Sequence, residues 1–143
     1  MSEDIFHLGM KALIRNKRGE VLLLKKDPAT VGGNEYWDMP GGRVARGQSV
    51  EETLRREVEE ETGVREIVIG VHVGMVLSPF RIKTSDSDVG LILSVYQCQV
   101  PEAAEVQPAD TLVAYEWVAP AEAAKRIANK YPPDFCAMIA NIR

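Results

Sequence analysis

The stretch from Gly41 to Val64 (GGRVARGQSVEETLRREVEEETGV) constrains the fold of this 143-residue chain more than any other. It opens with two glycines and continues as an acid-rich segment with complete helix signals. Ser49 is a favoured N-cap, and Glu52 three residues later completes a capping box. Gly63 supplies the left-handed position that ends a helix. The stretch therefore predicts a glycine turn followed by a helix over residues 50–62.

The predicted helix carries an apolar stripe and an acidic stripe side by side. Val50, Leu54 and Val58 follow i, i+4, i+8 and are expected to face the core. The acidic stripe consists of three glutamates at i, i+3 and i+4: Glu57, Glu60 and Glu61. Like charges at this spacing oppose helix formation, whereas hard oxygen ligands on one rigid face suit a divalent cation such as Mg²⁺. A solvated surface helix with excess acid is the alternative interpretation.

The glycines and glutamates together resemble the signature of the Nudix hydrolase family, Gly-x5-Glu-x7-Arg-Glu-U-x-Glu-Glu-x-Gly-U, where U is a bulky apolar residue. The chain meets eight of the nine fixed positions, at Gly42, Arg56, Glu57, Val58, Glu60, Glu61, Gly63 and Val64. Gln48 stands at the remaining position, where the family has glutamate. The segment from Trp37 to Gly42 also resembles the W-x-x-P-G-G stretch common in the family, and Glu116 to Val118 resembles its late strand.

The rest of the chain predicts strands and two further helices. Strands are expected over residues 6–15, 21–24, 66–77, 89–100 and 112–118. The first two are expected to pair as a hairpin. Loops are expected over residues 27–35 and 81–88, and helices over residues 120–130 and 134–143, the last with Asp134 as its N-cap.

Strands mixed with helices favour a layered α/β architecture. The resemblance implies more, namely a Nudix-like α/β/α sandwich with a mixed β-sheet between helices. The length suits one domain, so we expect a single Nudix hydrolase domain over residues 1–143.

Composition excludes several classes of partner. Apolar residues make up 45% and charged residues 27%, as in ordinary globular proteins. The net charge of −4 and the lack of a basic tract argue against duplex nucleic acid. No apolar run approaches the roughly 18 residues that span a bilayer, and the N-terminus lacks signal-peptide order. Cys98 and Cys136 show neither metal nor disulfide spacing, so we expect free thiols and a cytoplasmic protein.

The resemblance implies hydrolysis of a nucleoside diphosphate linked to another group, with Mg²⁺ or Mn²⁺ as cofactor. A phosphoanhydride carries several negative charges, which metal ions neutralise while they activate water. The expected metal ligands are Glu57, Glu60 and Glu61, joined through the resemblance by the carbonyl of Gly42. Arg56 completes the expected catalytic set by orienting these glutamates. Glu57 is alternatively the general base.

The leading substrate class is a nucleoside triphosphate, oxidised ones included, which would give monophosphate and pyrophosphate. ADP-ribose, dinucleoside polyphosphates and nucleotide sugars are the alternatives. Gln48 keeps open a degenerate Nudix-fold module that binds nucleotides without catalysis. A calcium-binding protein is disfavoured, because a rigid helical triad does not resemble a flexible calcium loop. The resemblance also allows a homodimer, for which the sequence shows no apolar stripe.

Two residues are candidates for substrate contacts. Trp37 directly precedes the glycine turn and is a candidate to stack on a base, or alternatively to cap the core. Lys25, next to Lys26 at the end of a strand, is a candidate phosphate neighbour or an ordinary edge charge. Further carboxylates from later segments are candidates to join the site: Asp86, Asp88, Asp110 and Glu116.

Overall fold

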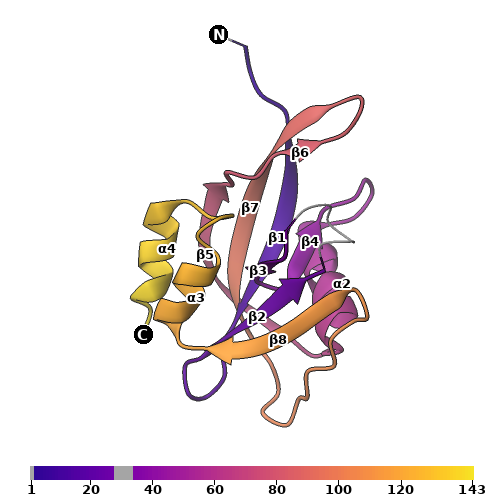
Figure 1. Ribbon diagram of the computed structural model, residues 1–143. Coiled ribbons are helices and arrows are strands. Elements are labelled where there is room, and N and C mark those ends of the chain that lie inside the picture. The colour runs from indigo at the N-terminus through magenta and orange to yellow at the C-terminus, as the bar shows by residue number, and fades with distance from the viewer. Residues whose placement is uncertain (1, 28–33) are drawn as a thin grey trace.

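The computed structural model describes residues 2–27 and 34–143, and this part of the chain forms two sheets and three helices (Figure 1). The strands are β1 (Phe6–Ile14), β2 (Val21–Lys26), β3 (Tyr36–Asp38), β4 (Gly41–Arg43), β5 (Val68–Leu77), β6 (Ile82–Lys83), β7 (Asp88–Gln99) and β8 (Leu112–Val118). The helices are α2 (Val50–Thr62), α3 (Pro120–Arg126) and α4 (Pro133–Ala140). Most of the loop expected over residues 27–35 lies outside the described residues.

The larger sheet has the order β4–β1–β7–β5, and β6 also pairs with β7. β1 runs parallel to β7, from the pair Phe6 and Gly90 to the pair Ile14 and Cys98. The other pairings in this sheet are antiparallel. The smaller sheet, β3–β2–β8, is antiparallel throughout. The predicted mixed sheet is therefore confirmed.

Helices cover the strands from two sides: Figure 1 shows α3 and α4 at the left, α2 at the right and the strands between them. Alternation along β1 supplies both apolar layers. Leu13 packs in the cluster that contains Phe135 of α4, whereas Ile14 packs in the cluster that contains Leu54 and Val58 of α2. This arrangement confirms the predicted α/β/α sandwich.

The predicted hairpin of residues 6–15 with 21–24 is wrong. β1 and β2 belong to different sheets, and Arg15, just after β1, forms an isolated bridge with Val21. Every residue from Val21 to Leu24 is buried, so this strand needs cover on both faces. It finds its partners in β3 and β8, while β1 pairs with β4 and β7.

The segment 81–88 is not all loop, because Ile82–Lys83 forms β6 and pairs antiparallel with the start of β7. Its turn is closed by hydrogen bonds between Thr84 and Ser87. Similarly, the glycines predicted as a turn form β4, which pairs with β1. The sequence did not reveal these strands, because β6 is only two residues long and β4, three residues long, depends on the distant β1.

The last two helices are shorter than predicted. α3 ends at Arg126 rather than Lys130. The prediction of Asp134 as N-cap is wrong, since α4 begins at Pro133 with Pro132 in the N-cap position. Proline at the first helical position loses no helical hydrogen bond, and Asp134 instead accepts a bond from the Phe135 N–H in the first turn. No helix in the described residues is long and apolar enough to cross a membrane.

Candidate active site

Helix α2 has the predicted ends. The Glu52 N–H donates to Ser49 Oγ at 3.1 Å, and the Ser49 N–H donates to Glu52 Oε2 at 3.4 Å, which confirms the capping box. Gly63 ends the helix in the left-handed region at φ 77°. The glutamate stripe of α2 therefore begins and ends in the register that the signature predicts.

The buried face of α2 differs from the predicted stripe at its start. Leu54 and Val58 are buried as expected, but Val50 is 44% exposed. Thr53 and Thr62 are fully buried in its place. Their hydroxyls donate to backbone carbonyls one turn earlier, at 2.8 and 2.7 Å. Because these hydrogen bonds satisfy both hydroxyls, threonine can face the core here.

The two glycines of β4 let the strand approach its neighbours closely. Gly41 has φ 149°, and a Cβ there would lie 2.9 Å from the Cα of Lys11. A Cβ on Gly42 would lie 2.6 Å from Glu57 Oε2. Only glycine fits at Gly41, whereas a Cβ at Gly42 would force the Glu57 carboxylate to move away from the strand.

The surroundings of the Glu57 carboxylate disfavour its charged form. Burial raises the pKa of Glu57, and the neighbouring charges of Glu61 and Glu60 raise it further, against the opposing effect of Arg56. A charge that is both partly buried and repelled by its neighbours gains from a bound cation. This observation fits the predicted metal site.

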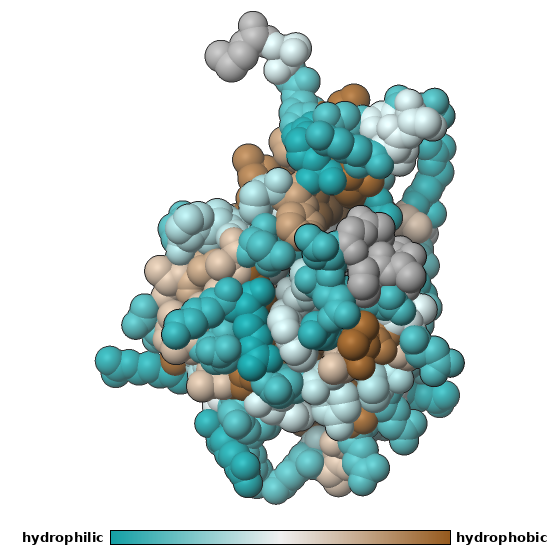
Figure 2. Space-filling model, viewed as in Figure 1, coloured by the Kyte–Doolittle hydropathy of each residue, from teal (hydrophilic) through white to brown (hydrophobic). Residues whose placement is uncertain are grey.

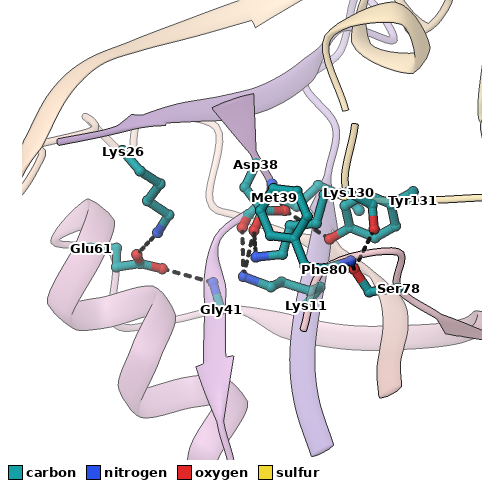
Figure 3. Close-up of polar contacts among 10 residues, drawn as sticks. All are labelled: Lys11, Lys26, Asp38, Met39, Gly41, Glu61, Ser78, Phe80, Lys130 and Tyr131. Carbon is teal, nitrogen blue, oxygen red and sulfur yellow. Dashed lines mark hydrogen bonds and ion pairs between the residues drawn. The ribbon is translucent and has the colours of Figure 1, made fainter. Parts of the chain in front are cut away.

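The carboxylate of Glu61 holds α2 against two strands. It accepts a hydrogen bond from the Gly41 N–H at 2.7 Å and forms an ion pair with Lys26 (Figure 3). The side chain is only 13% exposed. Glu61 therefore lies beside the glycine strand as Glu57 does, but its charge is already offset by a lysine.

Glu60 points away from this pair and is 57% exposed. Arg56 Nη1 donates to Glu60 Oε1 at 3.1 Å, and its Nη2 lies 3.2 Å from Glu57 Oε1. The same Nη2 donates to Gln48 Oε1 at 3.0 Å. Arg56 therefore bridges two glutamates, and the amide of Gln48 serves as a third acceptor for it.

In the described residues, no three acidic, histidine or cysteine side chains are already gathered at metal-binding spacing. Glu57 and Glu61 lie against β4, while Glu60 faces outward with Arg56. The donor chemistry, carboxylate and carbonyl oxygen, suits a hard cation. The roles of the three glutamates and of the Gly42 carbonyl as metal ligands stay predictions.

A cavity of about 840 Å³ opens beside the C-terminal end of α2, where Glu61 belongs to its lining. Its described lining carries six basic residues, namely Lys11, Lys26, Arg43, Arg81, Lys83 and Lys130. The acidic residues of the described lining are Asp27, Glu35 and Glu61. An excess of positive charge in a cleft attracts polyanions, so this cavity suits a ligand that carries several phosphates.

The predicted substrate contacts Trp37 and Lys25 do not line the described part of this cavity. Side chains alternate along a strand, and it is Tyr36 that faces the cavity. Trp37 packs against the core, with the Arg126 guanidinium 4.8 Å from its ring centroid. Lys25 pairs with Glu35 at 2.8 Å. The contacts of Trp37 match the core-cap interpretation, and substrate binding by either residue stays a prediction.

None of the four later carboxylates, Asp86, Asp88, Asp110 and Glu116, belongs to the described lining of the cavity. Asp88 lies 2.7 Å from Arg81, and Glu116 lies 2.7 Å from Arg126. These two are thus engaged in surface ion pairs. Thr111, next to Asp110, does line the cavity.

The sequence interpretation missed a buried polar network centred on Asp38 (Figure 3). Asp38 is fully buried, and its Oδ2 lies 2.9 Å from Lys11 Nζ and 2.6 Å from Lys130 Nζ. Its Oδ1 accepts from the Tyr131 hydroxyl at 2.7 Å and from the Met39 N–H at 2.8 Å. One signal was visible beforehand, since a lysine in the apolar strand GMKALI needs a buried partner.

The network perturbs each of its charges. Burial alone would raise the pKa of Asp38, but Lys11 and Lys130 hold it well below its usual range. Burial also opposes the charge on Lys11, yet the carboxylates of Asp38 and Glu61 raise its pKa. For Lys130 burial prevails, and its pKa falls to about 8 despite the attraction of Asp38.

Comparison with known proteins decides the family. The model of the NUDIX domain matches residues 5–136. This chain belongs to the Nudix hydrolase family. The crystal structure of the MutT protein from Methanosarcina mazei Go1 superposes on this Nudix chain with a TM-score of 0.75 at 30% identity. That match covers 97% of this chain and 96% of the other.

Curated relatives match shorter parts of this Nudix protein. A putative 8-oxo-dGTP diphosphatase of Bacillus subtilis is 40% identical over 55 residues, which cover 38% of this chain and 34% of the relative. The nucleoside triphosphatase NudI of Salmonella typhimurium is 32% identical over 92 residues, which cover 62% of this chain and 64% of NudI. In both alignments the chain thus spans less than two thirds of the relative's length.

Proposed function

We propose that this Nudix hydrolase cleaves nucleoside triphosphates, oxidised ones included, into nucleoside monophosphate and pyrophosphate with Mg²⁺ as cofactor. The observation that carries the proposal is the position of the cavity. The basic lining of the cavity continues onto β4, the strand of Gly41 and Gly42, and the carboxylates of Glu57 and Glu61 lie against the same strand. The relatives named as an 8-oxo-dGTP diphosphatase and a nucleoside triphosphatase support this substrate class.

Glu57 and Glu61 would hold the cation, with Glu60 and the Gly42 carbonyl as the other predicted ligands. When bound, Mg²⁺ neutralises phosphate charge and lowers the pKa of a bound water; Mn²⁺ supplies the same chemistry. Around it, Lys11, Lys26 and Arg43 line the cavity and are placed to bind phosphate oxygens.

Two further side chains have roles that their contacts support. Arg56 bridges Glu57 and Glu60 and so fixes the direction of both carboxylates. The raised pKa of Glu57, caused by burial and by Glu61, favours proton acceptance. Glu57 is therefore a candidate general base as well as a ligand. Gln48 keeps Arg56 in place through its amide oxygen, which favours an active enzyme over a degenerate binding module.

We also propose a cytoplasmic location, supported by Cys98 and Cys136, which are both free and buried. The homodimer stays a prediction that a mass measurement in solution tests. Figure 2 shows apolar residues interspersed among hydrophilic ones on one face of the molecule.

The test is product analysis on a nucleotide panel with Mg²⁺. The panel contains the common triphosphates, 8-oxo-dGTP, ADP-ribose, a dinucleoside polyphosphate and a nucleotide sugar. We expect the triphosphates to give monophosphate and pyrophosphate, so that inorganic phosphate appears only after a pyrophosphatase is added. Glu57→Gln serves as the matched inactive control. Hydrolysis of only ADP-ribose, the dinucleoside polyphosphate or the nucleotide sugar would mean that triphosphates are not the substrate class. No hydrolysis of any compound would favour the module that binds nucleotides without catalysis.

A further inference from the structure

Lys130 occupies an unusual place in the cavity. It lies beyond the end of α3, and its ammonium is 5.1 Å from the ring centroid of Tyr36 and 5.6 Å from that of Phe80. The two rings contact each other edge to face, with centroids 5.4 Å apart. All three residues line the cavity. Lys130 is therefore buried between the Asp38 carboxylate and two aromatic rings.

The backbone around Lys130 is fixed as well. The Ser78 hydroxyl donates to the Lys130 carbonyl at 2.6 Å and accepts from the Phe80 N–H at 3.0 Å (Figure 3). One side chain thus joins the segment after β5 to the segment after α3. This contact holds Phe80 and Lys130 in a constant relative position.

Asp38 anchors Lys130 but leaves it donors to spare. A carboxylate has about four acceptor sites, and Asp38 receives four donors, from Lys11, Lys130, Tyr131 and the Met39 N–H. Asp38 is therefore saturated and offers no acceptor to a ligand. Lys130 has three N–H groups and no acceptor in its charged form. What this corner of the cavity presents through Lys130 is hydrogen-bond donors only.

The apolar side chains of the cavity lie on the strands that follow Phe80, where Arg81 and Lys83 also belong to the lining. Leu91 and Leu93 of β7 and Ile82 of β6 line the cavity, and Gly9 of β1, opposite Leu93, adds no side chain. Figure 3 shows Lys26 and Glu61 together on one side, whereas Lys130 lies beside Lys11 and both lysines reach Asp38. The phosphates are proposed to bind beside the glycines of β4, where Lys26 and Glu61 lie, so Tyr36, Phe80 and Lys130 are left as the contacts for the base.

We infer that Lys130 is a specificity-determining residue that donates a hydrogen bond to a ring carbonyl of the nucleobase, so that the enzyme prefers keto bases to amino bases. The inference rests on the proposed function. Guanine and thymine present carbonyl oxygens where adenine and cytosine present amino groups. An amino group facing Lys130 would leave two donors opposed, and a site built to hydrogen-bond one group rejects an analogue that lacks it.

The experiment compares bases that differ at this edge, ITP with ATP and UTP with CTP, by their kcat/KM with Mg²⁺. We expect the keto member of each pair to be preferred by about tenfold or more. In Lys130→Met both ratios should fall toward one, chiefly through a higher KM for ITP and UTP. Lys130→Arg keeps a donor and should keep the preference. Lys125→Met, an exposed lysine of α3 outside the cavity, is the control.

The dissociation constants of IMP and AMP in EDTA give a second reading that needs neither metal nor turnover. If no nucleotide is hydrolysed, the proposed function fails, while tighter binding of IMP in the wild type but not in Lys130→Met would still support the inference. Equal treatment of keto and amino bases by the wild type would overturn the inference alone. An equal loss for all four triphosphates in folded Lys130→Met would also overturn it, because it would place Lys130 on phosphate.

Discussion

Two charged regions of this molecule each contribute residues to the same cavity and are built in opposite ways. The acidic face of α2 concentrates like charges, so that Glu57 lies partly buried beside Glu61 with a raised pKa. The Asp38 network concentrates opposite charges, with two lysines sharing one fully buried carboxylate. We expect a bound cation to stabilise the first arrangement. The second is complete in itself and is expected to shape the cavity rather than perform the chemistry.

The largest effect is expected on kcat, from a substitution in the acidic face of α2. Glu57→Gln should lower kcat by about 100- to 10,000-fold, because it removes both a predicted ligand and a candidate base. The fold should be intact, since an amide fits the same space without a repelled charge. Steady-state kinetics with Mg²⁺, together with circular dichroism, check this. Turnover within tenfold of the wild type would remove Glu57 from the chemistry.

The Asp38 network should respond in stability instead. Asp38→Asn leaves Lys11 and Lys130 buried without their carboxylate, which costs about 3–5 kcal/mol. That is roughly 10 °C or more in Tm for a chain of this size. Thermal unfolding measures the loss, and Asp134→Asn, an exposed aspartate of α4, is the matched control. If both variants melt near the wild type, the network is not a structural element.

Titration of Lys130 should sharpen the difference between the two regions. Its pKa is about 8 in the folded state, against an ordinary value of 10.5. Between these values the unfolded chain binds more protons, so the free energy of unfolding rises with pH. The gain from pH 8 to 10 is about 2 kcal/mol at most.

The measurement for this prediction is Tm against pH for the wild type and Lys130→Met, since their difference removes the titration of groups that do not interact with Lys130. The charged and titratable groups that act on Lys130 are Asp38, Lys11 and Lys26, and its ammonium also lies over the Tyr36 ring. The wild type should gain on the variant from pH 8 upward. A constant difference across this range would mean that Lys130 titrates normally.

Gln48→Glu should have the smallest effect. The new carboxylate would pair with Arg56, which is 38% exposed, and an exposed pair of this kind contributes less than about 1 kcal/mol. We expect kcat/KM to change by less than about fivefold. Kinetics at several Mg²⁺ concentrations check this. An inactive wild type that gains turnover from this substitution would show that Gln48 had disabled the site.

The two regions also differ in how far the sequence predicts them. The α2 site follows from neighbouring residues, because capping, periodicity and the signature spacing all lie within Gly41 to Val64. The Asp38 network joins positions up to 93 residues apart, and only the tertiary fold brings them together. The same distinction explains why α2 was predicted to its ends, whereas the hairpin of β1 with β2 was not.

The difference between the predicted and observed buried faces of α2 also has a physical cause. Val50 has the right period for the core but lies in the first turn and stays exposed, while threonines satisfied by backbone carbonyls are buried instead. The place of Trp37 before the glycine turn makes it a candidate for a base contact or a core cap, whereas strand alternation directs Tyr36 into the cavity.

The most direct test of the contrast is one set of thermal unfolding curves, in EDTA and in excess Mg²⁺, for the wild type, Glu57→Gln and Asp38→Asn. Saturating Mg²⁺ at about 100 times its dissociation constant stabilises by about 2.7 kcal/mol, or roughly 5 °C or more in Tm. We predict this gain in the wild type and in Asp38→Asn, which melts lower throughout. Glu57→Gln should keep or exceed the wild-type Tm in EDTA and lose most of the gain. A wild-type Tm indifferent to Mg²⁺, or an equal gain in Glu57→Gln, would contradict the claim that the acidic face of α2 is a metal site.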